Sequence, residues 1–217
     1  MATTTRRESP IFPALVVIGL ALVLALLPGR YRLTPEGVPF VASLTLAIPM
    51  LLAGFAPGDP RWARLERYAA VIVLPLAAFL QAALLAVLLR DMISGHSGIS
   101  GLSLLTTSVT IWAINLLIFA IGYWMLDRGG PAGRATGWQG RADFSFPRGD
   151  ASEGFPEDWQ PIFADYLALA FNTSSAFSPT DVLPLTPRAK MLMMVQSCIS
   201  LVTVITVAAR AINILGT

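Results

Sequence analysis

The sequence predicts an all-α integral membrane protein with five transmembrane helices, plus one short re-entrant or interfacial helix and loop before the last of them. The first observation is composition, because 55% of the 217 residues are hydrophobic and only 13% are charged. A soluble domain of this size has about a quarter charged residues. The second observation is five long apolar runs, each roughly long enough to cross about 30 Å of hydrocarbon. They cover residues 11–28, 39–55, 68–89, 102–126 and 189–215.

The first three runs have features that identify them as membrane helices. Arg6 and Arg7 precede the first run as in a signal peptide, but the run is long for one and lacks a small-x-small cleavage site. We therefore expect an uncleaved helix. Pro39 opens the second and shortest run, as proline often opens a helix. Asp59 and Pro60 precede the third, and the basic stretch 60–67 predicts an interfacial lead-in to it.

The chain divides into three parts by composition. Residues 1–126 form a four-helix transmembrane region. Residues 127–160 are rich in Gly, Pro and charge without a helical or strand period, and we expect a polar linker outside the hydrocarbon. Residues 161–217 contain the short helix, a pore-like loop and the last span. Thr186 as N-cap and Pro187 at the first helical position predict where that span begins.

The short apolar run "PIFADYLALAF" (161–171) is too short to cross a bilayer. We expect a helix that begins at Pro161 and ends near Asn172, with its partially negative end toward the polar loop. It either re-enters the membrane or lies on its surface, in which case the loop is a plain connector. If it re-enters, Asp165 is half-buried and needs a partner, for which Arg188 and Lys190 are nearest in sequence.

Polar residues in the last helix share one face, because Gln196, Ser200, Thr203 and Arg210 follow helical spacing. Such a face either lines a water path or packs against other helices, and we favour packing. The lone Cys198 is expected to be a small apolar residue. The sequence contains no acid–base pair, nucleophile triad, metal cluster or phosphate loop, so we expect neither an enzyme nor a cofactor or metal. A net charge of +2 gives no indication of nucleic acid.

The segment "SSAFSPTDVLPLTPRAK" (174–190) resembles the end of the filter and the start of the inner helix in the potassium-channel superfamily, T-T-V-G-Y-G-D-x-x-P-x-T. Asp181 matches the terminal aspartate of that pattern, while Pro184, Thr186 and Pro187 match the lead-in to the inner helix. Residues 178–180, Ser-Pro-Thr, replace its Gly-Tyr-Gly. Because proline fixes its own φ and restricts the residue before it, a standard potassium filter is not expected.

A closer resemblance is to a bacterial integral-membrane family of unknown function. Its members are similar in a basic loop after the second helix, an aromatic-rich fourth helix, a G-x-D-F-x-F-P-like stretch and a DY…F…T…SDV…T-R segment. In this chain these blocks are "RWARLER", "TIWAINLLIFAIGYW", "GRADFSFP" and "DYLALAFNTSSAFSPTDVLPLTPRAK". The resemblance implies an architecture and no activity.

These features predict a channel-like membrane protein that binds or conducts monovalent or divalent cations, without a standard potassium filter. Oxygen ligands suit such cations. The candidate ligands are Thr173, Ser174, Ser175, Ser178, Thr180 and Asp181. We expect a homo-oligomer in the bilayer of the bacterial inner membrane. The alternative is a non-conducting scaffold or assembly subunit, in which the loop is a plug or a docking surface.

Two arguments give opposite membrane orientations. Basic residues after the second and fourth spans favour a cytoplasmic N-terminus, which places the loop and Asp181 on the cytoplasmic side. A pore loop of the potassium-channel superfamily enters from outside, which implies an external N-terminus. The sequence leaves both orientations open.

Overall fold

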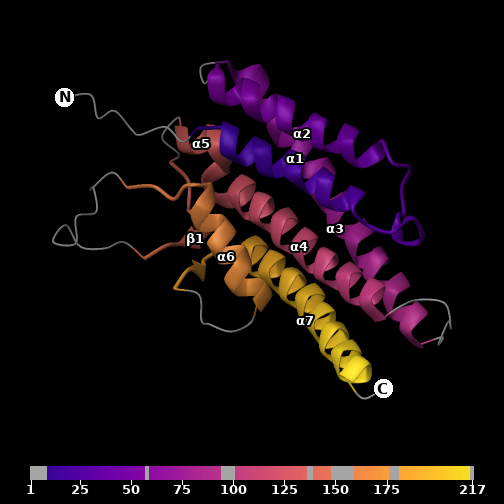
Figure 1. Ribbon diagram of the computed structural model, residues 1–217. Coiled ribbons are helices and arrows are strands. Elements are labelled where there is room, and N and C mark those ends of the chain that lie inside the picture. Colours follow the sequence, from indigo (N-terminus) through magenta and orange to yellow (C-terminus); the bar gives the residue numbers. More distant parts are fainter. Residues whose placement is uncertain are drawn as a thin grey trace.

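Four helices in the described part of the chain are long and apolar enough to cross a bilayer, which indicates a multi-pass membrane protein. They are α2 (Val38–Phe55), α3 (Pro60–Ile93), α4 (Gly101–Leu126) and α7 (Pro187–Leu215). The computed structural model describes residues 9–56, 59–93, 101–135, 139–147, 159–175 and 181–215, with the side chains of 101 and 210–215 excepted. The long helices run roughly along one another (Figure 1).

The first predicted span is shorter than expected. Helix α1 (Ile11–Ala25) has 15 residues, which is about 22 Å at ~1.5 Å per residue. It ends before Pro28, because a proline disfavours helical backbone at the residue that precedes it. A short 3₁₀ turn, η1 (Gly29–Tyr31), follows. By length alone, α1 does not reach across about 30 Å of hydrocarbon.

The predicted starts of two long helices are confirmed. Helix α3 begins at Pro60, and the N–H of Arg61 donates to Asp59 Oδ1 at 2.8 Å. Helix α7 begins at Pro187, and the N–H of Ala189 donates to the Thr186 hydroxyl at 3.3 Å. Both starts combine a side-chain cap with proline at the first helical position. The basic lead-in 60–67 is therefore the first two turns of α3.

The bundle has two ends, which we call the Pro187 end and the Arg30 end. At the Pro187 end, the start of α1 meets α6 (Phe163–Ser175) through the rings of Phe12 and Phe163, with centroids 5.6 Å apart. At the Arg30 end, Arg30 pairs with Asp91 near the end of α3 at 2.8 Å. The spanning helices alternate in direction between these ends, and α7 starts at the Pro187 end (Figure 1).

The predicted linker contains regular structure, so the expectation of none between residues 127 and 160 is wrong in part. A 3₁₀ turn, η2 (Asp127–Gly129), leads into α5 (Gly130–Ala135). Further on, β1 (Phe144–Ser145) pairs antiparallel with β2 (Leu183–Pro184), just before α7. Elements of two and six residues are too short to give a sequence period.

A left-handed turn joins α4 to α5. Its φ angles are +51° at Arg128, +73° at Gly129 and +76° at Gly130. A Cβ at Gly130 would lie 3.0 Å from the carbonyl oxygen of Met125, so glycine fits this close approach.

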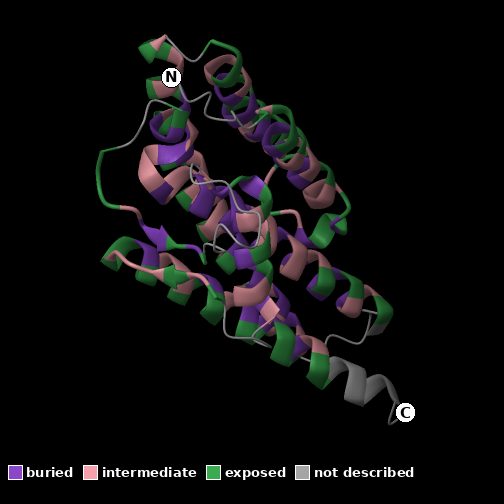
Figure 2. Ribbon diagram, turned by 90° about the vertical axis from the view of Figure 1, so that its left-hand side faces the viewer, coloured by how far each residue is buried: buried purple, intermediate pink, exposed green. Residues whose placement is uncertain are grey.

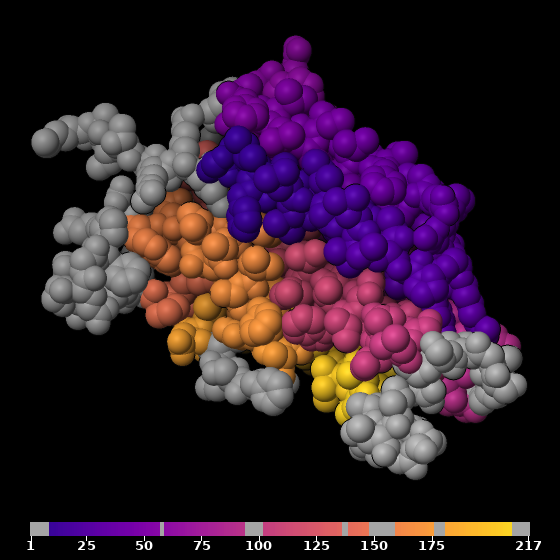
Figure 3. All heavy atoms as spheres, in the orientation of Figure 1, coloured from indigo at the N-terminus to yellow at the C-terminus, as the bar shows by residue number. Residues whose placement is uncertain are grey.

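Helix α6 packs between α4 and α7 and also touches α1. It begins at Phe163 and ends at Ser175, close to the predicted bounds. The two neighbours α1 and α6 lie side by side on one face of the molecule (Figure 3). Buried residues gather inside the bundle and exposed ones along its outer faces (Figure 2). The side chains buried around the start of α6 are largely aromatic, and include those of Trp124, Phe144, Phe163 and Tyr166.

Candidate functional site

The end of α6 lies halfway along its two neighbours. The carbonyl of Ser174 accepts hydrogen bonds from Trp112 Nε1, at 3.5 Å, and from the hydroxyl of Ser200. Ser200 is thirteen residues after Pro187, and Trp112 is fourteen before Leu126, so each contact is about 20 Å along its helix from the Pro187 end. Accordingly, α6 lies beside only the first part of α7 (Figure 1).

A group of buried polar side chains surrounds this helix end, and we call it the midway polar network. Its members are Asn115, Tyr123, Ser174, Gln196 and Ser200. Gln196 Nε2 donates to Ser174 Oγ at 2.7 Å and to the carbonyl of Ala170 at 2.9 Å. The Tyr123 hydroxyl donates to Gln196 Oε1. The network thereby links α4, α6 and α7 through one glutamine.

The predicted polar face of α7 packs against other helices over its described part. The exposed fractions of Gln196, Ser200 and Thr203 are 0%, 1% and 0%. The Thr203 hydroxyl donates to the Ile199 carbonyl of its own helix at 2.8 Å. Hydroxyl and amide groups at such contacts join helices inside a membrane. The side chain of Arg210 lies outside the described part.

The structure brings some of the predicted ion ligands together. Thr173, Ser174 and Ser175 form the last turn of α6. The hydroxyls of Thr173 and Ser175 donate to carbonyls of their own helix, Leu169 and Phe171, at 2.8 and 3.0 Å. Asp181 is exposed and lies two residues before β2. Ser178 and Thr180 lie outside the described residues.

Replacing Gln196 with leucine tests the midway polar network. We expect Gln196→Leu to lower the free energy of unfolding by about 2 kcal/mol, because Tyr123 and Ser174 lose their buried partner. The measurement is reversible unfolding by SDS in mixed micelles, followed by circular dichroism. Thr45→Val is the control, because its exposed hydroxyl bonds only to its own helix. Equal losses in both variants would contradict the prediction.

A second polar group, which we call the anchor cluster, lies at the Pro187 end. It consists of Asp127, Arg134, Asp143, Tyr166, Thr186 and Arg188. Asp127 is fully buried, and its Oδ1 accepts the backbone N–H groups of Asp143 and Phe144 at 2.8 and 3.2 Å. Its Oδ2 accepts the Tyr166 hydroxyl at 2.7 Å. Burial raises the pKa of Tyr166 well above its ordinary value, so this phenol stays protonated and donates.

Asp143 is the other buried carboxylate of the anchor cluster. Arg188 donates to it in a bidentate manner, at 2.7 Å to each oxygen, and the Thr186 hydroxyl donates to Oδ1 at 2.5 Å. The Leu185 N–H donates to its backbone carbonyl at 2.7 Å. Bidentate pairs fix geometry as well as adding energy. Asp143 therefore fixes the segment between β2 and α7 in place.

Neither of the candidate partners of Asp165, Arg188 and Lys190, forms an ion pair with it among the described residues. Asp165 Oδ2 instead accepts the N–H of Ile162 at 2.8 Å, three residues earlier, as in a capping box. Burial raises the pKa of Asp165, and the Ile162 hydrogen bond opposes that rise. The Asp165 carboxylate therefore caps its own helix, and the Arg188 guanidinium pairs with Asp143 instead.

Arg134 connects the anchor cluster to a small polar cavity. Its Nη1 donates to the carbonyls of Trp124 and Asp127, and its guanidinium lies 5.4 and 5.2 Å from the ring centroids of Trp124 and Tyr166. Its Nη2 and Glu66 Oε1 have no hydrogen-bond partner among the described residues. Both residues line a cavity of about 100 Å³, which is large enough for water to bridge them.

Sequence reasoning gave no role to the carboxylates of the anchor cluster. Asp143 lies in "GRADFSFP", Tyr166 in "DY" and Arg188 in "T-P-R", so the blocks of the second resemblance converge here. That convergence of separate blocks is the signal that could have indicated the cluster. The described residues contain no group of three or more His, Cys, Asp or Glu that could hold a metal ion.

Comparison with known proteins adds no relative. No protein-family model, no curated protein and no solved structure matches the chain. The two resemblances therefore stay predictions.

Proposed function

We propose that the chain is a channel-like integral membrane protein with five spans, in which α6 and the segment up to Asp181 form a re-entrant helix and loop that binds and conducts cations. One observation carries the proposal. Ser174 lies halfway along α4 and α7, whereas Leu183 is paired with β1 at the Pro187 end. A chain that enters to the middle and returns to the same end has the geometry of a re-entrant segment.

The electrostatics at the end of α6 suit a cation. The last carbonyls of a helix lack partners within it and carry partial negative charge. Thr173, Ser174 and Ser175 add oxygen atoms at this end, and Asp181 adds a carboxylate further along the chain. Membrane proteins bind ions where a half-helix ends in irregular backbone that lines a cavity.

The order of elements supports the channel-like frame. The long helix α4, the short helix α6 and the long helix α7 occur in this order, with η2, α5 and β1 between α4 and α6 and with β2 before α7. This order is that of the potassium-channel superfamily, which the loop resembles. Conduction in such a frame needs several copies of the loop around one axis, so the proposal includes a homo-oligomer.

The proposal also assigns α1 and the orientation. A helix of 15 residues can cross a bilayer that thins locally, at a modest cost in free energy. In this proposal α1 is therefore a span, which together with α2, α3, α4 and α7 makes five. Basic side chains are concentrated at the Pro187 end, and include those of Arg61, Arg64, Arg67, Arg128, Arg134, Arg141, Arg188 and Lys190. The Pro187 end therefore faces the cytoplasm of a bacterial inner membrane, and the loop enters from that side.

Cation flux into liposomes that contain the purified full chain tests this function. We expect wild-type flux above that of empty liposomes, and a decrease of about tenfold in Asp181→Asn, the equivalent of ~1.4 kcal/mol. The physical reason is the loss of negative charge on the path. Glu36→Gln is the control, because Glu36 is an exposed carboxylate in the loop at the Arg30 end, and its flux should stay within about twofold.

Absence of wild-type flux from folded protein would contradict the pore and favour the scaffold alternative. That alternative also has an observation behind it. The polar face of α7 and the hydroxyls of Thr173 and Ser175 are engaged in contacts within the chain. Chemical crosslinking in the same liposomes then distinguishes an oligomeric scaffold from a monomer.

A further inference from the structure

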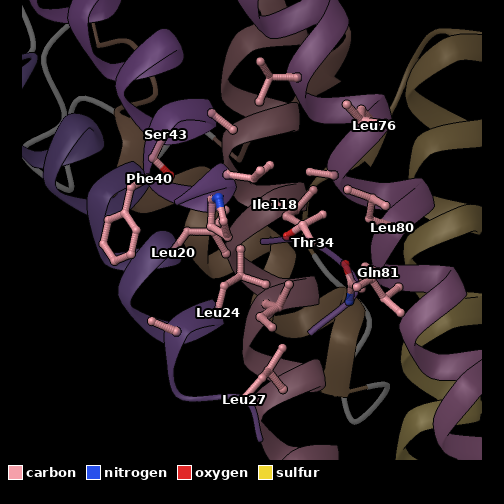
Figure 4. A pocket seen from close by; sticks show the side chains of 18 of the residues that line it. Leu20, Leu24, Leu27, Thr34, Phe40, Ser43, Leu76, Leu80, Gln81 and Ile118 are labelled. Atoms are coloured by element: carbon pink, nitrogen blue, oxygen red, sulfur yellow. The ribbon is translucent and has the colours of Figure 1, made fainter. Parts of the chain in front are cut away.

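A second cavity lies among α1, α2, α3 and α4, away from the anchor cluster and the midway polar network. Its volume is about 330 Å³, and it is lined by α1, α2, α3, α4 and the segment between α1 and α2. Ligand sites usually have volumes of about 300–1,000 Å³ with mostly apolar walls and few polar groups. Leu20, Leu24, Leu80 and Ile118 supply apolar walls here (Figure 4).

Two polar side chains in the wall have a buried atom without a hydrogen-bond partner among the described residues, namely the Tyr31 hydroxyl and Gln81 Oε1. Gln81 is 3% exposed, and its Nε2 donates to the Ile111 carbonyl at 3.1 Å. Its Oε1 has no partner among the described residues. Because Nε2 is held by α4, the amide cannot turn Oε1 away without losing that bond. A buried carbonyl oxygen without a donor is unfavourable, so Gln81 Oε1 is available as a hydrogen-bond acceptor.

The charged residues at the cavity are already paired. Arg32 donates to Glu36 and to the carbonyls of Ala25 and Leu27. No unpaired charge among the described lining residues therefore attracts an ionic ligand. Val38, Phe40 and Leu76 also line the cavity and are 42%, 38% and 55% exposed. These exposed apolar side chains belong to α2 and α3, both candidate spans, so a ligand would enter the cavity from the hydrocarbon of the bilayer.

We infer that this cavity binds a neutral, lipid-soluble alcohol, whose hydroxyl donates to Gln81 Oε1 and whose chain lies among the leucines. The apolar wall selects the chain, and the unpartnered Gln81 Oε1 selects the hydroxyl group. Paired charges disfavour fatty acids and amines, which carry a charge of their own. The site is independent of the proposed cation function, because it is built by α1 to α4.

Photolabelling of the detergent-solubilised full chain tests the site. The probe is a ten-carbon alcohol with a diazirine in its chain, and mass spectrometry locates the labelled peptides. The competitors are decan-1-ol and methyl decyl ether, which differ in the hydroxyl donor. We expect labelling within α1 to α4, with decan-1-ol competing about fivefold better than the ether because only the alcohol donates to Gln81.

Three variants make the test specific. Gln81→Leu should remove the preference for the alcohol, so that both competitors act alike. Ala77→Phe should abolish labelling, because Ala77 lines the cavity. Ala82→Phe is the matched control, since Ala82 is exposed on the same helix, and its labelling should match wild type.

Two results would overturn the inference. Equal competition by alcohol and ether in the wild type would mean that Gln81 selects nothing. Equal labelling of the Ala77→Phe and Ala82→Phe variants would place the probe on the outer surface. Circular dichroism of each variant shows whether a loss of labelling reflects unfolding, and the Ala77 and Ala82 pair decides the question if Gln81→Leu does not fold.

Discussion

Asp127→Ala should lower the free energy of unfolding by about 4 kcal/mol, the largest effect of any substitution proposed for this chain. Asp127 is fully buried, and its carboxylate accepts two backbone N–H groups and the Tyr166 hydroxyl. Its removal leaves three buried donors without an acceptor, and Arg128, whose Nε lies 3.6 Å from Asp127 Oδ2, loses its counter-charge. Unfolding by SDS in mixed micelles, followed by circular dichroism, measures the loss.

Partial removal of the same contacts should give a graded series. Tyr166→Phe deletes one donor and keeps the ring, so a loss of about 1.5 kcal/mol is expected. Asp181→Ala is the control, because Asp181 is exposed, and its effect should stay within about 0.5 kcal/mol. A loss in Asp127→Ala no greater than in Asp181→Ala would show that the anchor cluster does not hold the Pro187 end together.

Asp143→Ala should lower the free energy of unfolding by about 3 kcal/mol, and a double-mutant cycle with Arg188→Ala should show coupling of about 1–2 kcal/mol. Asp143 is fully buried, but the Arg188 side chain is 57% exposed, so solvent screens part of the interaction. The double variant should therefore be little worse than Asp143→Ala alone.

The matched control for this cycle is the pair of Arg32 and Glu36, four residues apart in sequence, in which the carboxylate is 82% exposed. Its coupling should not exceed about 0.5 kcal/mol. If the two cycles gave the same coupling, burial of Asp143 would contribute nothing, and the pairing of β1 with β2 would have to fix the start of α7 by itself.

Helix starts were predictable because their causes are local. A side-chain cap and a proline mark the beginnings of α3 and α7, and both starts are confirmed. The length of α1 was overestimated because apolar composition continues through Leu26 and Leu27, whereas backbone geometry before Pro28 ends the helix. Hydropathy alone therefore marks membrane segments better than it marks helix ends.

The contacts that position α6 were harder to predict, because they join residues far apart in the chain. The shared polar face of α7 was visible from helical spacing, and its packing role over Gln196, Ser200 and Thr203 follows from the contacts. By contrast, Asp143 and Arg188 are separated by 45 positions, and no local pattern pairs them. Asp165 accepts the N–H of Ile162, three residues earlier, whereas the sequence indicated only the basic residues Arg188 and Lys190 as partners.

The anchor cluster also determines the order in which the protein can be completed during synthesis. Asp127 and Asp143 leave the ribosome before Tyr166, Thr186 and Arg188, which bind them in the folded chain. At about 5–20 residues per second, Asp143 waits for roughly 2–9 seconds until Arg188 is made. Asp127 can be bound by Asp143, Phe144 and Tyr166 within that interval, whereas the Asp143 carboxylate has neither Thr186 nor Arg188. Synthesis of Thr186 and Arg188 is therefore the step that completes the anchor cluster, and a nascent chain stopped before Thr186 lacks both side chains that bind the Asp143 carboxylate.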